Sequence, residues 1–199
     1  MKEHGIIFTA PMIPPILAGD KTQTRRVMKP QPPTVSLLLL DAYNGGPQWN
    51  FWTLDHKVCN NLPIWKCPYG VPGNKLWVRE TWAEHPDGDG IIYRATDPGW
   101  DAEKTGVKWR SPRFMPRWAS RILLEVTEVC VQRVQDISEE DAKAEGAQQM
   151  CLDDLGQTFK TYKRGFEALW DTINKKRGYG WALNPWVWDI NFKLLEVKK

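Results

Sequence analysis

Apolar and polar positions alternate along the end of the chain, over residues 186–197. One face would carry Trp186, Trp188, Ile190, Phe192 and Leu194, and the other Val187, Asp189, Asn191 and Lys193. A period of two residues predicts a β-strand with one buried face. Residues 120–134 are rich in β-branched residues and roughly alternating as well, so they predict a second long strand.

Shorter segments predict further strands at 6–9, 22–27, 75–82 and 91–95. The turn sequence HPDGDG at 85–90 separates the last two and predicts a hairpin between them. Along 75–82, alternation places Leu76, Val78 and Glu80 on one face, and Trp77, Arg79 and Thr81 on the other.

Helical signals occur at three places. A single turn is expected at 12–18, where Gly19 would end it. Residues 136–147 predict a helix with Ser138 as its N-cap and an acidic residue three positions further on. A longer helix is expected over 160–174, with one apolar stripe formed by Phe166, Leu169, Trp170 and Ile173.

Two stretches fit neither pattern: residues 28–72, rich in Pro, Gly and Asn, and a basic loop at 97–118. The first is long for a bare loop and predicts an irregular, Trp-rich insertion with its own packing. Five or six strands, few helices and no strand–helix–strand alternation favour an α+β fold, either a small mixed barrel or a curled sheet with helices packed on it. We expect one domain over 1–199.

The composition is that of an ordinary globular chain. Its 42% hydrophobic and 26% charged residues exclude a disordered protein, and the net charge of +3 does not by itself indicate nucleic acid. The twelve Trp suit a β-rich core or a surface on which bases stack. Prolines interrupt the apolar N-terminal run, and the apolar run at 36–40 is too short to cross a bilayer. We expect a cytoplasmic protein with no membrane partner.

The cysteines do not predict a disulfide framework or a metal site. Four Cys are spaced irregularly in a long chain, without a CxxC pair. His56, Cys59 and Cys67 lie close in sequence, but their spacing fits no standard zinc motif and no fourth ligand is evident. We therefore expect no metal and no cofactor.

The segment AGDKTQTRR at 18–26 concentrates charge and hydroxyl groups. It lacks the glycine spacing of a phosphate loop, which excludes a P-loop NTPase. Lys21 could serve Thr24 as a base, or stabilise an oxyanion, if it lies in the turn before the strand. A base must be neutral, so its pKa would have to fall, and Arg25 and Arg26 are cationic neighbours that would lower it. A basic turn that binds phosphate or only water remains the alternative.

Two further groups of residues are candidates for binding. The segment 108–121 interleaves aromatic rings with cations, among them Lys108, Arg110, Arg113 and Arg117. It would bind RNA through phosphates and bases, or lie over the rim of the fold with Trp109 and Trp118 buried. The pair Arg79 and Glu80 would either cross the sheet surface as an ion pair or face the same cleft as Lys21.

The motif ILAGDKTQTRR resembles the signature of the ASCH family, which belongs to the PUA-like superfamily. The segments PGNKLWVRE, DISEEDAKAEG and WVWDINF follow in the order expected for that family, and the pattern is similar to its longer, prophage-type members. The resemblance implies a PUA-like small mixed β-barrel with two or three packed helices, here with the irregular Trp-rich insertion.

The resemblance also implies a function. Small ASCH members include a bacterial N4-acetylcytidine amidohydrolase, and its Lys, Thr and Glu correspond by motif to Lys21, Thr24 and Glu145. Amide hydrolysis needs a nucleophile, a proton shuttle and charge stabilisation, which these three groups can provide. The expected partner is a modified nucleoside or RNA, with Arg25 and Arg26 near the substrate. The alternatives are a ribonuclease, a non-catalytic RNA- or nucleotide-binding module, and an accessory protein that binds a phage or host protein.

Overall fold

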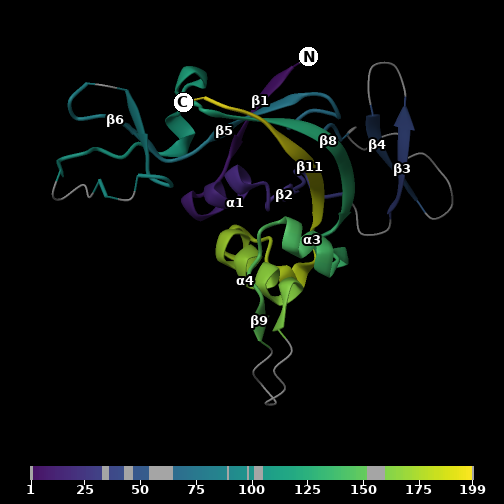
Figure 1. The fold of residues 1–199 in the computed structure, drawn as a ribbon. Coiled ribbons are helices and arrows are strands. Elements are labelled where there is room, and N and C mark those ends of the chain that lie inside the picture. Colours follow the sequence, from purple (N-terminus) through teal and green to yellow (C-terminus); the bar gives the residue numbers. More distant parts are fainter. Residues whose placement is uncertain are drawn as a thin grey trace.

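The computed structural model describes residues 2–32, 36–42, 47–53, 65–88, 90–97, 99–100, 105–151 and 160–198. A curled sheet occupies the centre of the molecule, a helical layer lies below it, and two small hairpins flank it, as Figure 1 shows. This arrangement confirms the predicted α+β class.

The central sheet has five strands in the order β1-β5-β8-β11-β2. These are β1 (Glu3–Ile7), β5 (Lys75–Arg79), β8 (Ile122–Arg133), β11 (Trp186–Val197) and β2 (Gln23–Val27). β1 and β5 are parallel, and the other pairs are antiparallel. No backbone pairing joins the edge strands β1 and β2 in the described residues, so the sheet is curled without closing as a hydrogen-bonded barrel.

A side chain connects the two edges instead. Arg26 Nη2 on β2 donates to the carbonyl of Ile7 at the end of β1, at 2.6 Å. The same guanidinium lies over the ring of Phe8, 5.1 Å from its centroid. The main hydrophobic core fills the concave side of the sheet and includes Phe8, Leu76, Val78, Leu124, Val126, Ile190 and Phe192.

The helix α1 (Ile13–Ala18) follows the 3-10 turn η1 (Ala10–Met12) and confirms the helical turn predicted at 12–18. Ile13 and Ile16 anchor it in the core. It ends at Gly19, whose φ of 82° is accessible to glycine at little cost. The chain then turns through Asp20 and Lys21 before β2 begins, so Lys21 lies in the turn as the sequence required.

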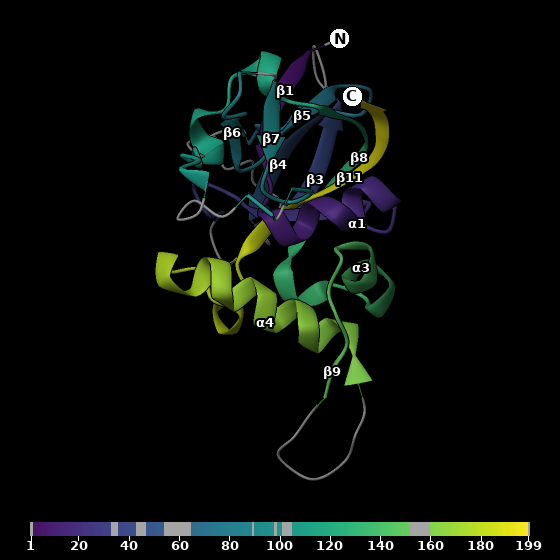
Figure 2. The same cartoon turned by 60° about the vertical axis from the view of Figure 1, so that its left-hand side comes forward.

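The helical layer consists of α3 (Glu139–Ala144) and α4 (Tyr162–Asn174), which pack against each other (Figure 2). Ser138 Oγ accepts from the backbone N–H of Asp141 at 3.0 Å, which confirms the predicted N-cap. The short strands β9 (Met150–Cys151) and β10 (Lys160–Thr161) pair between the helices. Phe166 and Trp170 of α4 form a second core with Val187 of β11.

That second core explains where the predicted alternation of β11 was wrong. Val187 and Asp189 were expected on an exposed face, yet both are buried, Asp189 with 6% of its surface exposed. The helical layer covers the second face at the start of the strand. From Lys193 to Val197 the strand is exposed.

Two hairpins extend from the sheet. β3 (Ser36–Ala42) and β4 (Pro47–Thr53) lie within the predicted insertion, which is therefore not wholly irregular. β6 (Trp82–Glu84) and β7 (Ile91–Tyr93) form a hairpin around HPDGDG as predicted, but its first strand is separate from β5, whereas the sequence predicted one strand over 75–82. The remaining 3-10 turns are η2 (Pro112–Phe114), η3 (Arg117–Ala119), η4 (Val134–Asp136), η5 (Lys175–Arg177) and η6 (Trp181–Leu183).

No helix among the described residues is long and apolar enough to cross a membrane.

Candidate functional site

The Lys21 side chain is buried, with 2% of the residue exposed, and its ammonium group is fully bonded. Nζ donates to the Glu145 carboxylate at 2.8 Å, to the Glu145 carbonyl at 2.5 Å and to the Gln23 carbonyl at 2.8 Å. An ammonium has three N–H donors, so each of them finds one acceptor here.

The end of α3 places Glu145 in this contact. Glu145 is the C-cap residue, and Gly146 with φ 78° turns the chain away behind it. The backbone N–H of Thr22 donates to the carbonyl of Ala144 at 2.9 Å, which fixes the start of β2 against the helix end. A cation at this point also satisfies a carbonyl that the helix leaves unbonded. Glu145 is 4% exposed, whereas a glutamate at a helix end is usually solvated.

Burial lowers the pKa of Lys21 below its ordinary value, because desolvation disfavours the ammonium form. The charge and hydrogen bond of Glu145 oppose this shift, and the positive charges of Arg26 and Arg25 add to it. A lysine that acts as a base needs a lowered pKa, and the pKa of Lys21 is shifted in that direction. The main cause of the shift is desolvation, and the neighbouring arginines from which the sequence predicted it contribute less.

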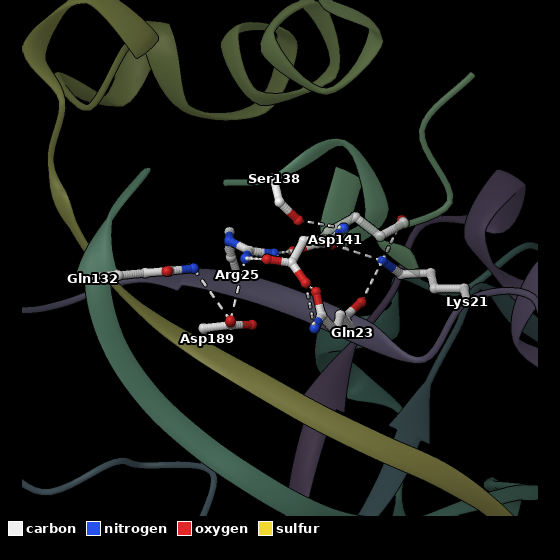
Figure 3. A network of polar contacts seen from close by, with 8 residues as sticks. Lys21, Gln23, Arg25, Gln132, Ser138, Asp141 and Asp189 are labelled. Atoms are coloured by element: carbon white, nitrogen blue, oxygen red, sulfur yellow. Dashed lines mark hydrogen bonds and ion pairs between the residues drawn. The ribbon is translucent and has the colours of Figure 1, made fainter. Parts of the chain in front are cut away.

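Arg25 connects Glu145 to two aspartates, and Figure 3 shows its contacts with Asp141 and Asp189. Its guanidinium lies 3.5 Å from Glu145 Oε1, 3.1 Å from Asp141 Oδ2 and 3.2 Å from Asp189 Oδ2. Gln23 bonds both Arg25 and Asp141, so the Gln23 and Arg25 side chains on one face of β2 are bound to α3. The network therefore fixes the carboxylate that contacts Lys21.

Asp189 lies opposite Arg25 in the β2–β11 register. Burial raises its pKa to about 6, while the Arg25 charge opposes the shift. Its Oδ2 accepts from Gln132 as well as from Arg25, and its Oδ1 is buried without a partner in the described part of the chain.

Thr24 points to the other face of β2 and lines a cleft of about 430 Å³, together with Arg26 and Glu145. It is 4% exposed, and its hydroxyl makes no hydrogen bond within the described residues. The hydroxyl is thus available to a ligand in the cleft. Aromatic residues complete much of the wall: Tyr69, Phe166, Trp170, Tyr179 and Trp188.

Lys21 does not line this cleft but lines a second cavity of about 380 Å³. The two cavities share Met12, Glu145 and Leu169. The structure therefore brings Lys21 and Glu145 into direct contact and places Thr24 and Glu145 on the wall of one cleft. Glu145 therefore takes part in the contact with Lys21 and also lines the cleft of Thr24.

The structure places Arg79 and Glu80 apart from these cavities. Glu80 is 1% exposed and accepts two bonds from Arg121, at 3.0 and 3.1 Å. Arg79 bonds the carbonyl of Arg113 and lies over the ring of Trp77. Neither residue is among the described residues that line the two cavities, and Glu80 pairs with Arg121, so the structure supports neither of the two alternatives for this pair.

The segment 108–121 also lies outside the two cavities. Arg110 pairs with Glu84 at 2.9 Å, and Arg117 pairs with Glu3 at 2.7 Å. Lys108 and Arg113 are exposed. Trp118 is 68% exposed, which contradicts the alternative in which it is buried, whereas Trp109 is partly buried.

Three cations of the cleft were missed by the sequence reasoning: Lys29, Lys66 and Arg177. They come from distant segments, and no local motif connects them. Asp189 was also missed as a site residue, although a carboxylate in the middle of an apolar strand is a signal that the sequence contained.

No group of three potential metal ligands occurs among the described residues. His56 and Cys59 lie outside the described residues. Burial raises the pKa of the Cys67 thiol to about 12, which disfavours the thiolate that a metal would require.

Comparison with known proteins identifies no family. No family model matches the chain, and no curated protein matches it. Among solved structures, protein EF3133 from Enterococcus faecalis V583, of the family model DUF984, is similar with a TM-score of 0.45 and 9% sequence identity. The match covers 100% of this chain and 84% of that one. At this TM-score the likeness carries no argument, and the ASCH resemblance stays a prediction.

Proposed function

We propose that this protein hydrolyses the amide of an N4-acylated cytidine. The observation that carries the proposal is the buried Lys21–Glu145 pair, because Glu145 lines the same cleft as Thr24. Thr24 and Glu145 both line a cavity of about 430 Å³, within the usual range of small-molecule sites, and Lys21 reaches this pair through its contact with Glu145.

In the proposed reaction, Thr24 Oγ1 attacks the acyl carbonyl carbon. Its proton passes to the Lys21–Glu145 pair, which protonates the cytidine nitrogen as the C–N bond breaks. Water then hydrolyses the Thr24 ester, which releases the carboxylic acid and restores the hydroxyl. The sum is amide plus water giving amine plus acid.

Two properties of the site support these roles. The lowered pKa of Lys21 makes proton exchange with Glu145 easier than for an exposed lysine. Arg25 holds the other carboxylate oxygen of Glu145, so the carboxylate is oriented before substrate binds.

The test follows cytidine release from N4-acetylcytidine by the purified protein. Thr24→Val removes the hydroxyl while keeping the shape of the side chain, and we expect activity to fall by about 1,000-fold or more. Thr24→Ser keeps a hydroxyl and should retain measurable turnover. Lys21→Ala and Glu145→Gln should also abolish release, with folding checked by circular dichroism.

Thr22→Ala is the matched control, because Thr22 is an exposed threonine two positions away. It should leave the rate unchanged. Turnover that persists in Thr24→Val would exclude Thr24 as the nucleophile, and no turnover by the wild-type protein would reject the substrate.

A second candidate is a nucleotide- or RNA-binding module without turnover. The observation that favours it is the complete bonding of the Lys21 ammonium, which is typical of a static ion pair. A binding module would retain ligand in Thr24→Val and release no product from N4-acetylcytidine. Cleavage of a labelled RNA would instead indicate the ribonuclease alternative.

A further inference from the structure

The charge of the cleft is strongly unbalanced. Among the described residues that line it, only Glu145 is acidic, and its carboxylate is already bonded to Lys21 and Arg25. Five lining residues are cationic: Arg25, Arg26, Lys29, Lys66 and Arg177. Only Arg25 has carboxylate partners at salt-bridge distance in the described part of the chain.

Three of these cations form what we call the cationic rim: Lys29, Lys66 and Arg177. All three are exposed, and none has a carboxylate partner among the described residues. Lys29 follows β2, Lys66 precedes β5 and Arg177 ends η5, so three separate segments bring positive charge to one cleft. Like charges gathered around a cavity repel one another unless an anion enters it.

Arg26, which also lines the cleft, retains an unused donor. Its Nη2 is bonded to Ile7, but its Nε is buried with no acceptor in the described residues. Buried donors are normally bonded, so an unmet donor in a residue that lines the cleft is consistent with a ligand oxygen.

Aromatic rings accompany the cations. Tyr69 and Tyr179 are partly exposed, and Lys29 Nζ lies 5.2 Å from the Tyr179 ring. Trp170 and Trp188 also line the cleft. Rings that can contact a base, next to cations that can contact a phosphate, match the two halves of a nucleotide.

We propose that the cationic rim binds a phosphate group attached to the nucleoside in the cleft, so that the ligand is a nucleotide rather than a free nucleoside. The inference rests on the proposed function in one respect: the cleft must receive a cytidine-type nucleoside. The phosphate can belong to a mononucleotide or to a residue of an RNA strand, and both present the same group to the rim.

The test is calorimetric titration of the intact protein with cytidine, cytidine 5′-monophosphate and a short cytidine-containing RNA. We expect the monophosphate to bind at least about tenfold more tightly than cytidine, since two charge-assisted contacts suffice for such a difference. The advantage should shrink as salt is raised.

Lys66→Ala/Arg177→Ala should remove the advantage of the monophosphate over cytidine. The matched control is Lys108→Ala/Lys176→Ala, which removes the same charge from exposed residues that do not line the cleft. The control variant should still bind the monophosphate more tightly than cytidine. If the RNA binds more tightly than the monophosphate and is equally sensitive to the rim variant, the phosphate comes from a strand.

Equal binding of cytidine and its monophosphate would overturn the phosphate site and leave the proposed hydrolase intact. An advantage that the control pair abolishes equally would also overturn it, because general surface charge would then explain the effect. Preferred binding of the monophosphate without any hydrolysis of acylated substrate would support the rim and reject the reaction. Binding of none of the three ligands would reject both.

Discussion

At the scale of single residues, the buried charges differ in how well their partners compensate them. Glu80 is buried but receives both bonds from Arg121, whose guanidinium also lies 3.9 Å from the Tyr93 ring centroid. Asp189 has one oxygen bonded and one without a partner in the described residues. Stability should therefore depend on these two carboxylates in different ways.

Glu80→Gln should lower the free energy of unfolding by about 3 kcal/mol, because the half-buried Arg121 would lose its counter-charge. The matched control is Glu3→Gln, which breaks the more exposed pair with Arg117 and should cost less than about 1 kcal/mol. Urea denaturation at neutral pH measures both. Similar losses in the two variants would contradict the importance of burial here.

The raised pKa of Asp189 should make the free energy of unfolding depend on pH. Its pKa is raised to about 6 in the folded protein, so the folded state binds a proton more tightly than the unfolded state. The resulting stabilisation is present below the unfolded pKa of 3.8 and is lost as the pH rises through about 6.

Relative to Asp189→Asn, the wild-type protein should therefore lose about 2–3 kcal/mol of unfolding free energy between about pH 4 and pH 7. Denaturation curves of both proteins across this range measure the difference. A difference in unfolding free energy that is constant with pH would show that the Arg25 charge balances desolvation at Asp189, and wild-type stability that rises with pH would show that the charge outweighs it.

At the scale of elements, α4 packs closely on the segment that follows α3 and Glu145. Gly165 of α4 is buried, and a Cβ added there would fall 1.7 Å from the carbonyl oxygen of Gln148. No side chain can be accommodated at that distance from backbone. The glycine thus permits a contact that keeps α4 close to the segment and to the cleft.

Gly165→Ala should destabilise the protein by about 1–3 kcal/mol, because α4 or the 145–148 segment must move. The sign is informative, since an alanine inside a helix otherwise stabilises by about 0.5–1 kcal/mol. Gly180→Ala is the control, where the added Cβ meets only the flexible side chain of Lys175 at 3.4 Å and other atoms further away. Thermal unfolding of the two variants measures the contrast, and a more stable Gly165→Ala protein would disprove the close approach.

At the scale of the whole molecule, a hydrogen bond joins the two ends of the insertion. Trp65 Nε1 donates to the Pro30 carbonyl at 2.8 Å, so the segment that enters the insertion is bonded to the segment that leaves it. The paired strands β3 and β4 form their own two-stranded sheet and add no strand to the central one.

Replacing residues 33–64 with a short Gly/Ser linker should therefore leave the central sheet folded. We expect the free energy of unfolding to change by no more than about 1 kcal/mol, since shortening a loop has only a small entropic effect. Circular dichroism and chemical denaturation would check this. Loss of cooperative unfolding would show that the insertion is part of the core. Cytidine release by the shortened protein, compared with the full chain, would show whether the insertion belongs to the substrate site.

The sequence by itself determined the features that depend on neighbouring residues. Alternation located β8 and β11, the Ser138 cap located the start of α3, and Gly19 located the end of α1. Each of these signals acts within a few residues, where side-chain period and backbone conformation are set by local chemistry. The position of Lys21 in the turn before β2 followed from the same kind of evidence.

Only the tertiary structure decided which distant residues meet. The partner of Glu80 proved to be Arg121, Asp189 became buried because α3 and α4 cover the start of β11, and the cationic rim was assembled from three separate segments. The physical reason is that strand order and helix placement lie beyond local periodicity. A single sequence states how each segment folds, whereas the charge and shape of the cleft depend on how the segments pack.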